Sequence, residues 1–232
     1  MVQLTPNMPY ITLRVKFVKR AELQYISHLD LVRTMHKIIV RSGLPLWYTE
    51  GFNPKPKMVF AAPLSIGTES LVEFMDLRLV ERIDPMAAIT ALNANMTDEL
   101  VVLDAYYPEN KLTDLKWLSY VITVNTTGAS DELAARCNSA FLADSMPVAK
   151  KQKPDDTVDI KPLIKFANAV YDSGIIRIDC ILSADPSAFL NPEYVVKYLR
   201  SACGILSSDN LMSESYSILR CFAYTADMVE YR

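Results

Sequence analysis

The sequence predicts an α+β protein made of two tandem ferredoxin-like units with antiparallel sheets, at residues 9–108 and 113–232. Three observations support this prediction. Both halves show segments in the order β-α-β-β-α-β, which is the ferredoxin-like arrangement. The 232 residues are half apolar, so each half is long enough to build a core of its own. The predicted segments also follow one another without a long unexplained loop.

Residues 10–19 predict the first strand because apolar side chains alternate along them. One face of this strand is apolar and is formed by Ile11, Leu13, Val15 and Phe17. The opposite face carries Arg14, Lys16 and Val18, so we expect a half-buried strand with a basic outer side.

Residues 28–42 predict a helix. At 100° per residue, one stripe of this helix is apolar and consists of Leu31, Val32, Met35, Ile38 and Ile39. Ser27 is a natural N-cap, and Asp30 completes a capping box three residues later. Gly43 is expected to end the helix.

The remaining elements follow from the same patterns. In the first half, after the helix, we expect a short strand at residues 44–48, a loop at 49–57 and a returning extended segment at 58–62. A long strand at 71–80, a helix at 84–95 and a strand at 100–107 follow. In the second half we expect a strand at residues 117–125, a helix at 131–142 and two short extended pieces at 147–151 and 158–164. A strand at 174–183, a helix at 192–203 and a strand at 216–225 follow.

Charge is polarised along the chain. The first 60 residues hold nine Lys/Arg and three acidic residues, a net charge of +6, whereas the rest holds 15 and 24, a net charge of −9. The overall charge of −3 hides this asymmetry. We therefore expect an anionic partner for the N-terminal end.

Several classes of protein are disfavoured. There is no apolar run long enough for a membrane helix and no signal-peptide pattern, so we expect a cytoplasmic protein. The four cysteines are widely spaced and are expected to be buried thiols, so the sequence predicts neither a metal site nor a cofactor. No phosphate-binding glycine motif and no catalytic carboxylate pair is present, which favours a non-catalytic role.

A row of cations on the first helix is a candidate RNA-binding feature. Arg33, Lys37 and Arg41 are four residues apart and lie opposite the apolar stripe, where they can follow phosphates. The alternative is an ordinary solvated face, with Asp30 paired to Arg33.

The segment E-G-F-N-P-K-P-K, residues 50–57, is a second candidate. Its prolines stiffen the loop and would present Phe52, Lys55 and Lys57, a combination suited to single-stranded nucleic acid. The alternative is a rigid hairpin with Phe52 packed into the core.

His28 and His36 are the only histidines, and they lie about 80° apart around the helix, so they do not form a metal-binding pair. His28 is expected beside the helix cap and His36 beside the apolar stripe. Either could serve as the base of an RNA-cleaving enzyme, which is the less favoured alternative.

The chain also resembles a known family. The segments Y-I-S-H-L-D-L-V-R (25–33), G-L-P-L (43–46), E-G-F-N-P-K-P-K (50–57), A-P-L-S-I-G (62–67) and V-D-I-K-P-L-I (158–164) resemble the radical SAM-linked protein family, an uncharacterised family fused to or encoded beside a cobalamin-binding-type radical SAM protein. That family usually has histidine at the position of Lys55. The departure weakens a catalytic role for this position but keeps a basic contact.

The resemblance implies a radical SAM protein as partner. Because this chain lacks the cluster-binding C-x-x-x-C-x-x-C motif, it would be an accessory subunit that helps to bind an RNA substrate. Two alternatives stay open. One is an RNA endonuclease of the tandem ferredoxin-like type that uses a histidine, and the other is a structural partner that binds only protein.

Overall fold

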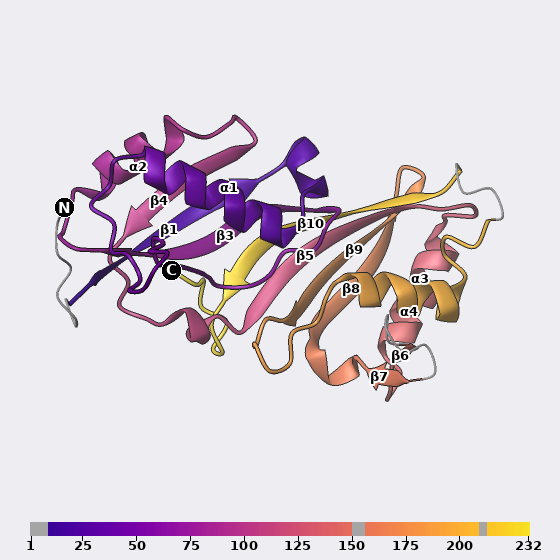
Figure 1. Cartoon of the computed structure of the whole chain (residues 1–232). Coiled ribbons are helices and arrows are strands. Elements are labelled where there is room, and N and C mark those ends of the chain that lie inside the picture. Colours follow the sequence, from indigo (N-terminus) through magenta and orange to yellow (C-terminus); the bar gives the residue numbers. More distant parts are fainter. Residues whose placement is uncertain (1–8, 150–155, 209–212) are drawn as a thin grey trace. The chain divides into compact units, whose positions relative to one another are not determined.

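The computed structural model describes residues 9–149, 156–208 and 213–232 (Figure 1). It is an α+β protein with antiparallel sheets, which confirms the predicted fold class at this level. The chain divides into two compact units. The first extends to Asp114 and also contains Arg232, and the second comprises Leu115–Tyr231.

The sheet of the first unit has the strand order β4-β1-β3-β2, with antiparallel neighbours. In chain order its elements are β1 (Ile11–Lys19), the 3-10 helix η1 (Ala21–Tyr25), α1 (His28–Arg41), β2 (Met58–Phe60), β3 (Thr68–Leu79), α2 (Pro85–Asn93), β4 (Leu100–Tyr106) and the 3-10 helix η2 (Leu112–Asp114). Helices α1 and α2 lie on the same face of this sheet (Figure 1), and their buried side chains share one core with the apolar face of β1.

Helix α1 begins as the sequence predicts. The Asp30 N–H donates to Ser27 Oγ over 3.1 Å, and the Ser27 hydroxyl donates to Asp30 Oδ2 over 2.6 Å. The fully buried side chains of α1 are those of Leu31, Met35, Ile38 and Ile39. The predicted stripe is therefore confirmed, with Val32 at its half-buried margin.

The expected basic outer side of β1 is wrong for Arg14, which is completely buried. Its guanidinium forms an ion pair with Asp76 on β3 (Nε–Oδ1 2.7 Å) and donates to the side chain and the carbonyl of Asn110. It also donates to a backbone oxygen of Arg232 over 3.3 Å. Lys19 at the end of β1 is buried too, whereas Lys16 is half-buried.

The sheet of the second unit has the order β10-β5-β9-β8, again with antiparallel neighbours. In chain order its elements are β5 (Trp117–Asn125), α3 (Asp131–Phe141), β6 (Pro147–Ala149), β7 (Thr157–Asp159), the 3-10 helix η3 (Lys161–Leu163), β8 (Ile164–Asp172), β9 (Ile175–Ser183), α4 (Glu193–Cys203) and β10 (Ser215–Tyr224). Helices α3 and α4 pack against each other.

One part of the predicted second half is wrong. The extended pieces expected at residues 147–151 and 158–164 do not enter the main sheet but form the separate β6–β7 hairpin. The sheet strand at this point is β8, which was not among the predicted segments. Asn138 of α3 anchors β8, because its side-chain amide exchanges two hydrogen bonds of 2.8 and 2.7 Å with the backbone of Ala169. Residues 150–155, which include the end of the first piece, lie outside the described residues.

Glu214 ties together two loops of the second unit. Its carboxylate accepts hydrogen bonds from the Thr126 hydroxyl (2.8 Å), the Thr127 N–H (2.7 Å) and the Ser208 N–H (2.8 Å). These bonds, with that of the Thr127 N–H contributing most, lower the pKa of Glu214 from 4.5 to about 2. The ionised carboxylate therefore stabilises the fold above about pH 4.5, and this contribution is lost as the pH falls towards 2.

We expect Glu214→Gln to flatten the pH dependence of Tm between about pH 4.5 and 2, the range bounded by the two pKa values. Thermal melts followed by circular dichroism at a series of pH values measure this. Glu132→Gln, at an exposed position of α3, is the control and should keep the wild-type profile. If both variants gave the same curve, Glu214 would not be the responsible group.

The cysteines are free thiols, of which Cys137, Cys180 and Cys203 are buried and Cys221 is half-buried. Burial raises the pKa of Cys137 to about 12, so this thiol is not a reactive nucleophile. Across the described ranges, no helix has both the length and the apolar character needed to span a membrane.

Candidate nucleic-acid interface

The cations predicted on α1 are exposed to solvent. Arg33, Lys37 and Arg41 lie within an arc of about 80° on the side of the helix opposite the buried stripe. Arg33 donates to Asp30 over 3.1 Å, and both side chains are more than half exposed, so the charge of Arg33 is partly compensated. The hydroxyl of Ser27, followed by Arg33, lowers the pKa of Asp30. Lys37 and Arg41 form no ion pair within the described parts of the chain, so their charge is available to a partner.

The loop after α1 is a rigid hairpin. The Thr49 N–H donates to the Lys55 carbonyl over 2.9 Å, and the Lys55 N–H donates to Thr49 Oγ1 over 3.1 Å. Further down, the Lys57 N–H donates to the Trp47 carbonyl over 3.1 Å. The expected strand at residues 44–48 is thus reduced to isolated bridges that hold the base of this hairpin.

The hairpin is also fixed to the sheet of the first unit. Arg78 of β3 accepts a hydrogen bond at its carbonyl from the Trp47 N–H (2.8 Å) and donates its own N–H to the Lys57 carbonyl (3.1 Å). Gly51 at the tip has a φ of +114°, a conformation that side-chain-bearing residues rarely adopt. The tip residues are consequently presented by a defined backbone.

Phe52 projects from this tip and is fully exposed. The alternative in which it packs into the core is therefore wrong. Lys55 and Lys57 are exposed as well. An aromatic ring and two ammonium groups thus stand free of the fold on one hairpin, the arrangement that the sequence suggested for stacking and phosphate contact.

His36 belongs to α1 and precedes Lys37 of the cation row. It is half-buried, and its pKa is lowered first by burial and then by the positive charge of Lys55. Lys55 of the hairpin thus contributes to the electrostatics of His36. Both predicted features belong to the first unit. We name the set Arg33, Lys37, Arg41, Phe52, Lys55 and Lys57 the basic surface.

The two histidines occupy different environments. The ring of His28 lies edge-on to that of Phe60, with centroids 5.3 Å apart, and is half-buried at the start of α1. His36 is half-buried on α1 instead, and burial, followed by the charge of Lys55, lowers its pKa and so favours the neutral imidazole. Among the described residues, no cluster of three His, Cys, Asp or Glu side chains could hold a metal ion.

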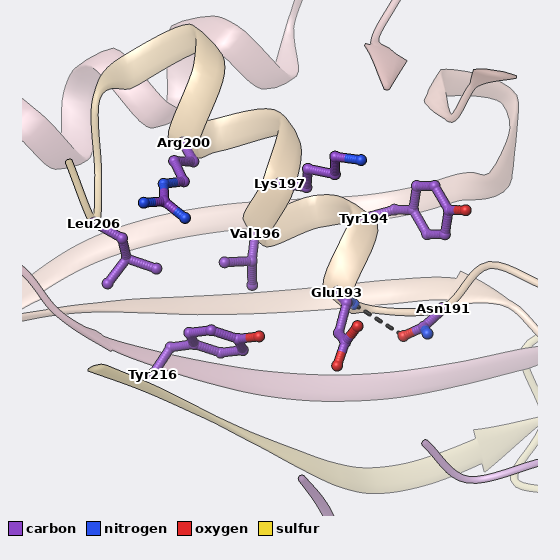
Figure 2. A pocket seen from close by; sticks show the side chains of 8 residues that line it. All are labelled: Asn191, Glu193, Tyr194, Val196, Lys197, Arg200, Leu206 and Tyr216. Carbon is purple, nitrogen blue, oxygen red and sulfur yellow. Dashed lines mark hydrogen bonds between the residues drawn. The ribbon is translucent and has the colours of Figure 1, made fainter. Parts of the chain in front are cut away.

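A cavity of about 340 Å³ in the second unit was not indicated by the sequence. It lies between α4 and the start of β10 (Figure 2), and it is lined by Asn191, Glu193, Tyr194, Val196, Lys197, Arg200, Leu206 and Tyr216. Glu193, Val196 and Arg200 recur at helical spacing on one side of α4 and face the ring of Tyr216 (Figure 2). The helical pattern alone could have shown that these side chains share a face, but not that Tyr216 lies opposite.

Among solved structures, the chain is similar to one in the "Crystal Structure of a Cbf5-Nop10-Gar1 Complex", with a TM-score of 0.51 and 10% sequence identity. The similarity covers 91% of this chain and 48% of the other, so this chain spans about half the length of that one. At this identity the similarity shows a shared fold only. Among curated proteins, a sequence comparison finds no significant match.

The family described as "Uncharacterized protein conserved in bacteria (DUF2344)" matches residues 12–192. The match includes β1, α1, the hairpin with Phe52, and all of the main-sheet strands except β10. The chain belongs to this bacterial family.

Proposed function

We propose that this protein is a non-catalytic accessory subunit of a radical SAM enzyme and that it binds an RNA substrate through the basic surface of its first unit. The observation that carries the RNA proposal is the fully exposed Phe52, held on a hydrogen-bonded hairpin between accessible cations. An exposed aromatic ring beside cations is the combination on which the bases of single-stranded nucleic acid stack while the phosphates are neutralised.

The fold supports the proposal at a finer level. We infer that both units are ferredoxin-like, because each sheet places its four strands in the order 4-1-3-2 when the main-sheet strands of that unit are numbered along the chain. The β6–β7 hairpin is then an insertion in the second unit. In such a fold the helices cover one sheet face, and the connections are free to carry binding residues, as the hairpin with Phe52 does.

The radical SAM partner rests on the resemblance of the sequence motifs, and the family match does not itself name such an enzyme. A specific observation favours a protein partner in addition to RNA. Phe166 and Val170 of β8 are 49% and 40% exposed and alternate with the buried Ala169, so they lie on the sheet face away from the core. Exposed apolar side chains of this kind suit a protein contact.

We expect Phe52→Ala to weaken binding to a single-stranded RNA oligonucleotide by about 1–3 kcal/mol, the usual contribution of one stacked base. Fluorescence anisotropy with a labelled oligonucleotide measures this. Because Phe52 makes no buried contact, the variant should keep the wild-type Tm within the small range of surface substitutions.

Phe166→Ala is the matched control, since it also removes an exposed phenylalanine but from the second unit. It should leave RNA affinity unchanged. RNA binding that is absent in the wild type, or equal in the two variants, would refute the proposed role of Phe52. If the wild type instead cleaved RNA and His36→Ala abolished the cleavage, the endonuclease alternative would replace this proposal.

A further inference from the structure

The cavity beside α4 has the size of a small-ligand site. Its volume of about 340 Å³ lies near the lower end of the range of roughly 300–1,000 Å³ in which small molecules bind. It therefore accommodates one compact group, such as a single nucleotide. All of its lining residues belong to the second unit, so the site is independent of the basic surface.

The ring of Tyr216 and two aliphatic side chains contribute apolar surface to the cavity. Tyr216 of β10 is 44% exposed, and its ring lies open towards α4 (Figure 2). Val196 and Leu206 are buried residues that border the same space. This combination favours a flat, partly apolar group that stacks on the tyrosine ring.

Arg200 supplies a cation at one end of the cavity. Arg200 is exposed, and within the described residues it forms no ion pair. Lys197 is used differently, because its ammonium donates to the Ala149 carbonyl over 2.6 Å. Arg200 is thus the group in this cavity that can receive a phosphate or carboxylate, for which the guanidinium has two parallel N–H donors.

Glu193 supplies a carboxylate at the other end of the cavity. Glu193 begins α4, where its backbone N–H donates to Asn191 Oδ1 over 3.0 Å, and its side chain extends towards Tyr216 (Figure 2). Burial, and then the charge of Glu193, raise the pKa of the Tyr216 hydroxyl, which supports their proximity. The half-buried carboxylate can accept two N–H donors from a ligand.

We propose that this cavity binds a guanine nucleotide, with the base stacked on Tyr216, its N–H edge donating to the Glu193 carboxylate and its phosphate paired with Arg200. Guanine fits because its N1–H and N2–H groups offer two adjacent donors, whereas adenine presents an acceptor beside its amino group. The nucleotide is either free guanosine monophosphate or a guanosine within single-stranded RNA, in which bases are recognised by stacking and by hydrogen bonds to their edges.

Isothermal titration calorimetry of the whole protein with guanosine and adenosine monophosphate tests the assignment. We expect a preference for the guanine nucleotide of roughly tenfold or more, as for one bidentate contact to a base. Glu193→Gln should abolish this preference. Arg200→Gln should weaken the binding of guanosine monophosphate but not that of guanosine, which has no phosphate. Tyr216→Leu should weaken the binding of both nucleotides, and Tyr216→Phe should bind them with the wild-type affinity.

Glu132→Gln and Arg136→Gln are matched controls, because they change exposed residues of the same types on α3. A uridine nonamer with one central guanosine, compared with the same nonamer carrying adenosine, identifies the source of the base. A guanine preference for the nonamer alone assigns the site to RNA, and a preference for the mononucleotide assigns it to the free ligand.

The inference is overturned if neither probe shows a guanine preference or if the preference survives in Glu193→Gln. Phe52→Ala should not alter binding of the mononucleotide. The failure of the basic surface and the failure of this cavity are therefore distinguishable.

Discussion

Asp76→Ala is expected to destabilise the protein by about 3–5 kcal/mol, because it removes a carboxylate that is paired with the buried Arg14 guanidinium. Arg14 is completely buried, and two of its nitrogens donate to the Asp76 carboxylate over 2.7 and 3.2 Å. Two other acceptors of Arg14, the side-chain and backbone oxygens of Asn110, are neutral and do not replace the charge of Asp76. Urea-induced unfolding followed by circular dichroism measures the free energy of unfolding.

The exposed pair Arg177–Asp179 on β9 gives the matched comparison. Its atoms are also close, at 2.9 Å, but its side chains are 47% and 37% exposed. Asp179→Ala should therefore lower the free energy of unfolding by only about 0–1 kcal/mol. Replacing both partners of the buried pair, as Arg14→Met with Asp76→Leu, should recover much of the stability lost in Asp76→Ala. Equal losses at the buried and exposed pairs would contradict this explanation.

The second large effect concerns the salt dependence of RNA binding. If the basic surface contacts phosphates, each lost cation should reduce the slope of log affinity against log salt by about 0.7, the value for single strands. The double variant Lys55→Gln, Lys57→Gln and the double variant Lys37→Gln, Arg41→Gln should thus each reduce the slope by about 1.4. Anisotropy titrations at several salt concentrations measure this slope.

Arg33→Gln should reduce this slope by less than the loss of one cation from either double variant does, because Asp30 already compensates the charge of Arg33. The double variant Arg136→Gln, Lys165→Gln on the second unit removes the same charge elsewhere and should keep the wild-type slope. A slope that falls equally for all double variants would show that binding follows net charge and not this surface.

Local sequence patterns predicted much of the first unit. The cap at Ser27 and the apolar stripe of α1 involve residues within a few turns of one another, so spacing alone determines them. Arg14 shows the limit of this approach. Alternation along β1 places its side chain on the second face of the strand, but only the positions of Asp76 and Asn110 decide that this face is buried.

Strand β8 was missed for a different reason. Its sequence I-K-F-A-N-A-V-Y-D contains alanine, asparagine and aspartate, which have low strand propensity, and it lies at the edge of the sheet, where burial is weak. A signal was nevertheless present. Ser173 and Gly174 both have positive φ, at 48° and 94°, so S-G marks the two-residue hairpin turn into β9.

The candidate site was predictable only in part. The cation row and the stiff hairpin follow from spacing and from the prolines, whereas the full exposure of Phe52 depends on what surrounds the tip. The cavity beside α4 joins side chains from α4, from residue 206 and from β10. Nothing in a linear pattern reports a distance between such segments.

The hairpin that carries Phe52 also has a kinetic consequence. Its backbone is already ordered by bonds at Thr49, Lys55 and Lys57 and by the fixed φ of Pro54 and Pro56. A partner that docks there does not have to freeze a mobile loop, so little conformational entropy is lost on association. Encounter should then proceed as rigid-body docking, with a rate governed by long-range attraction between charges and not by a folding step.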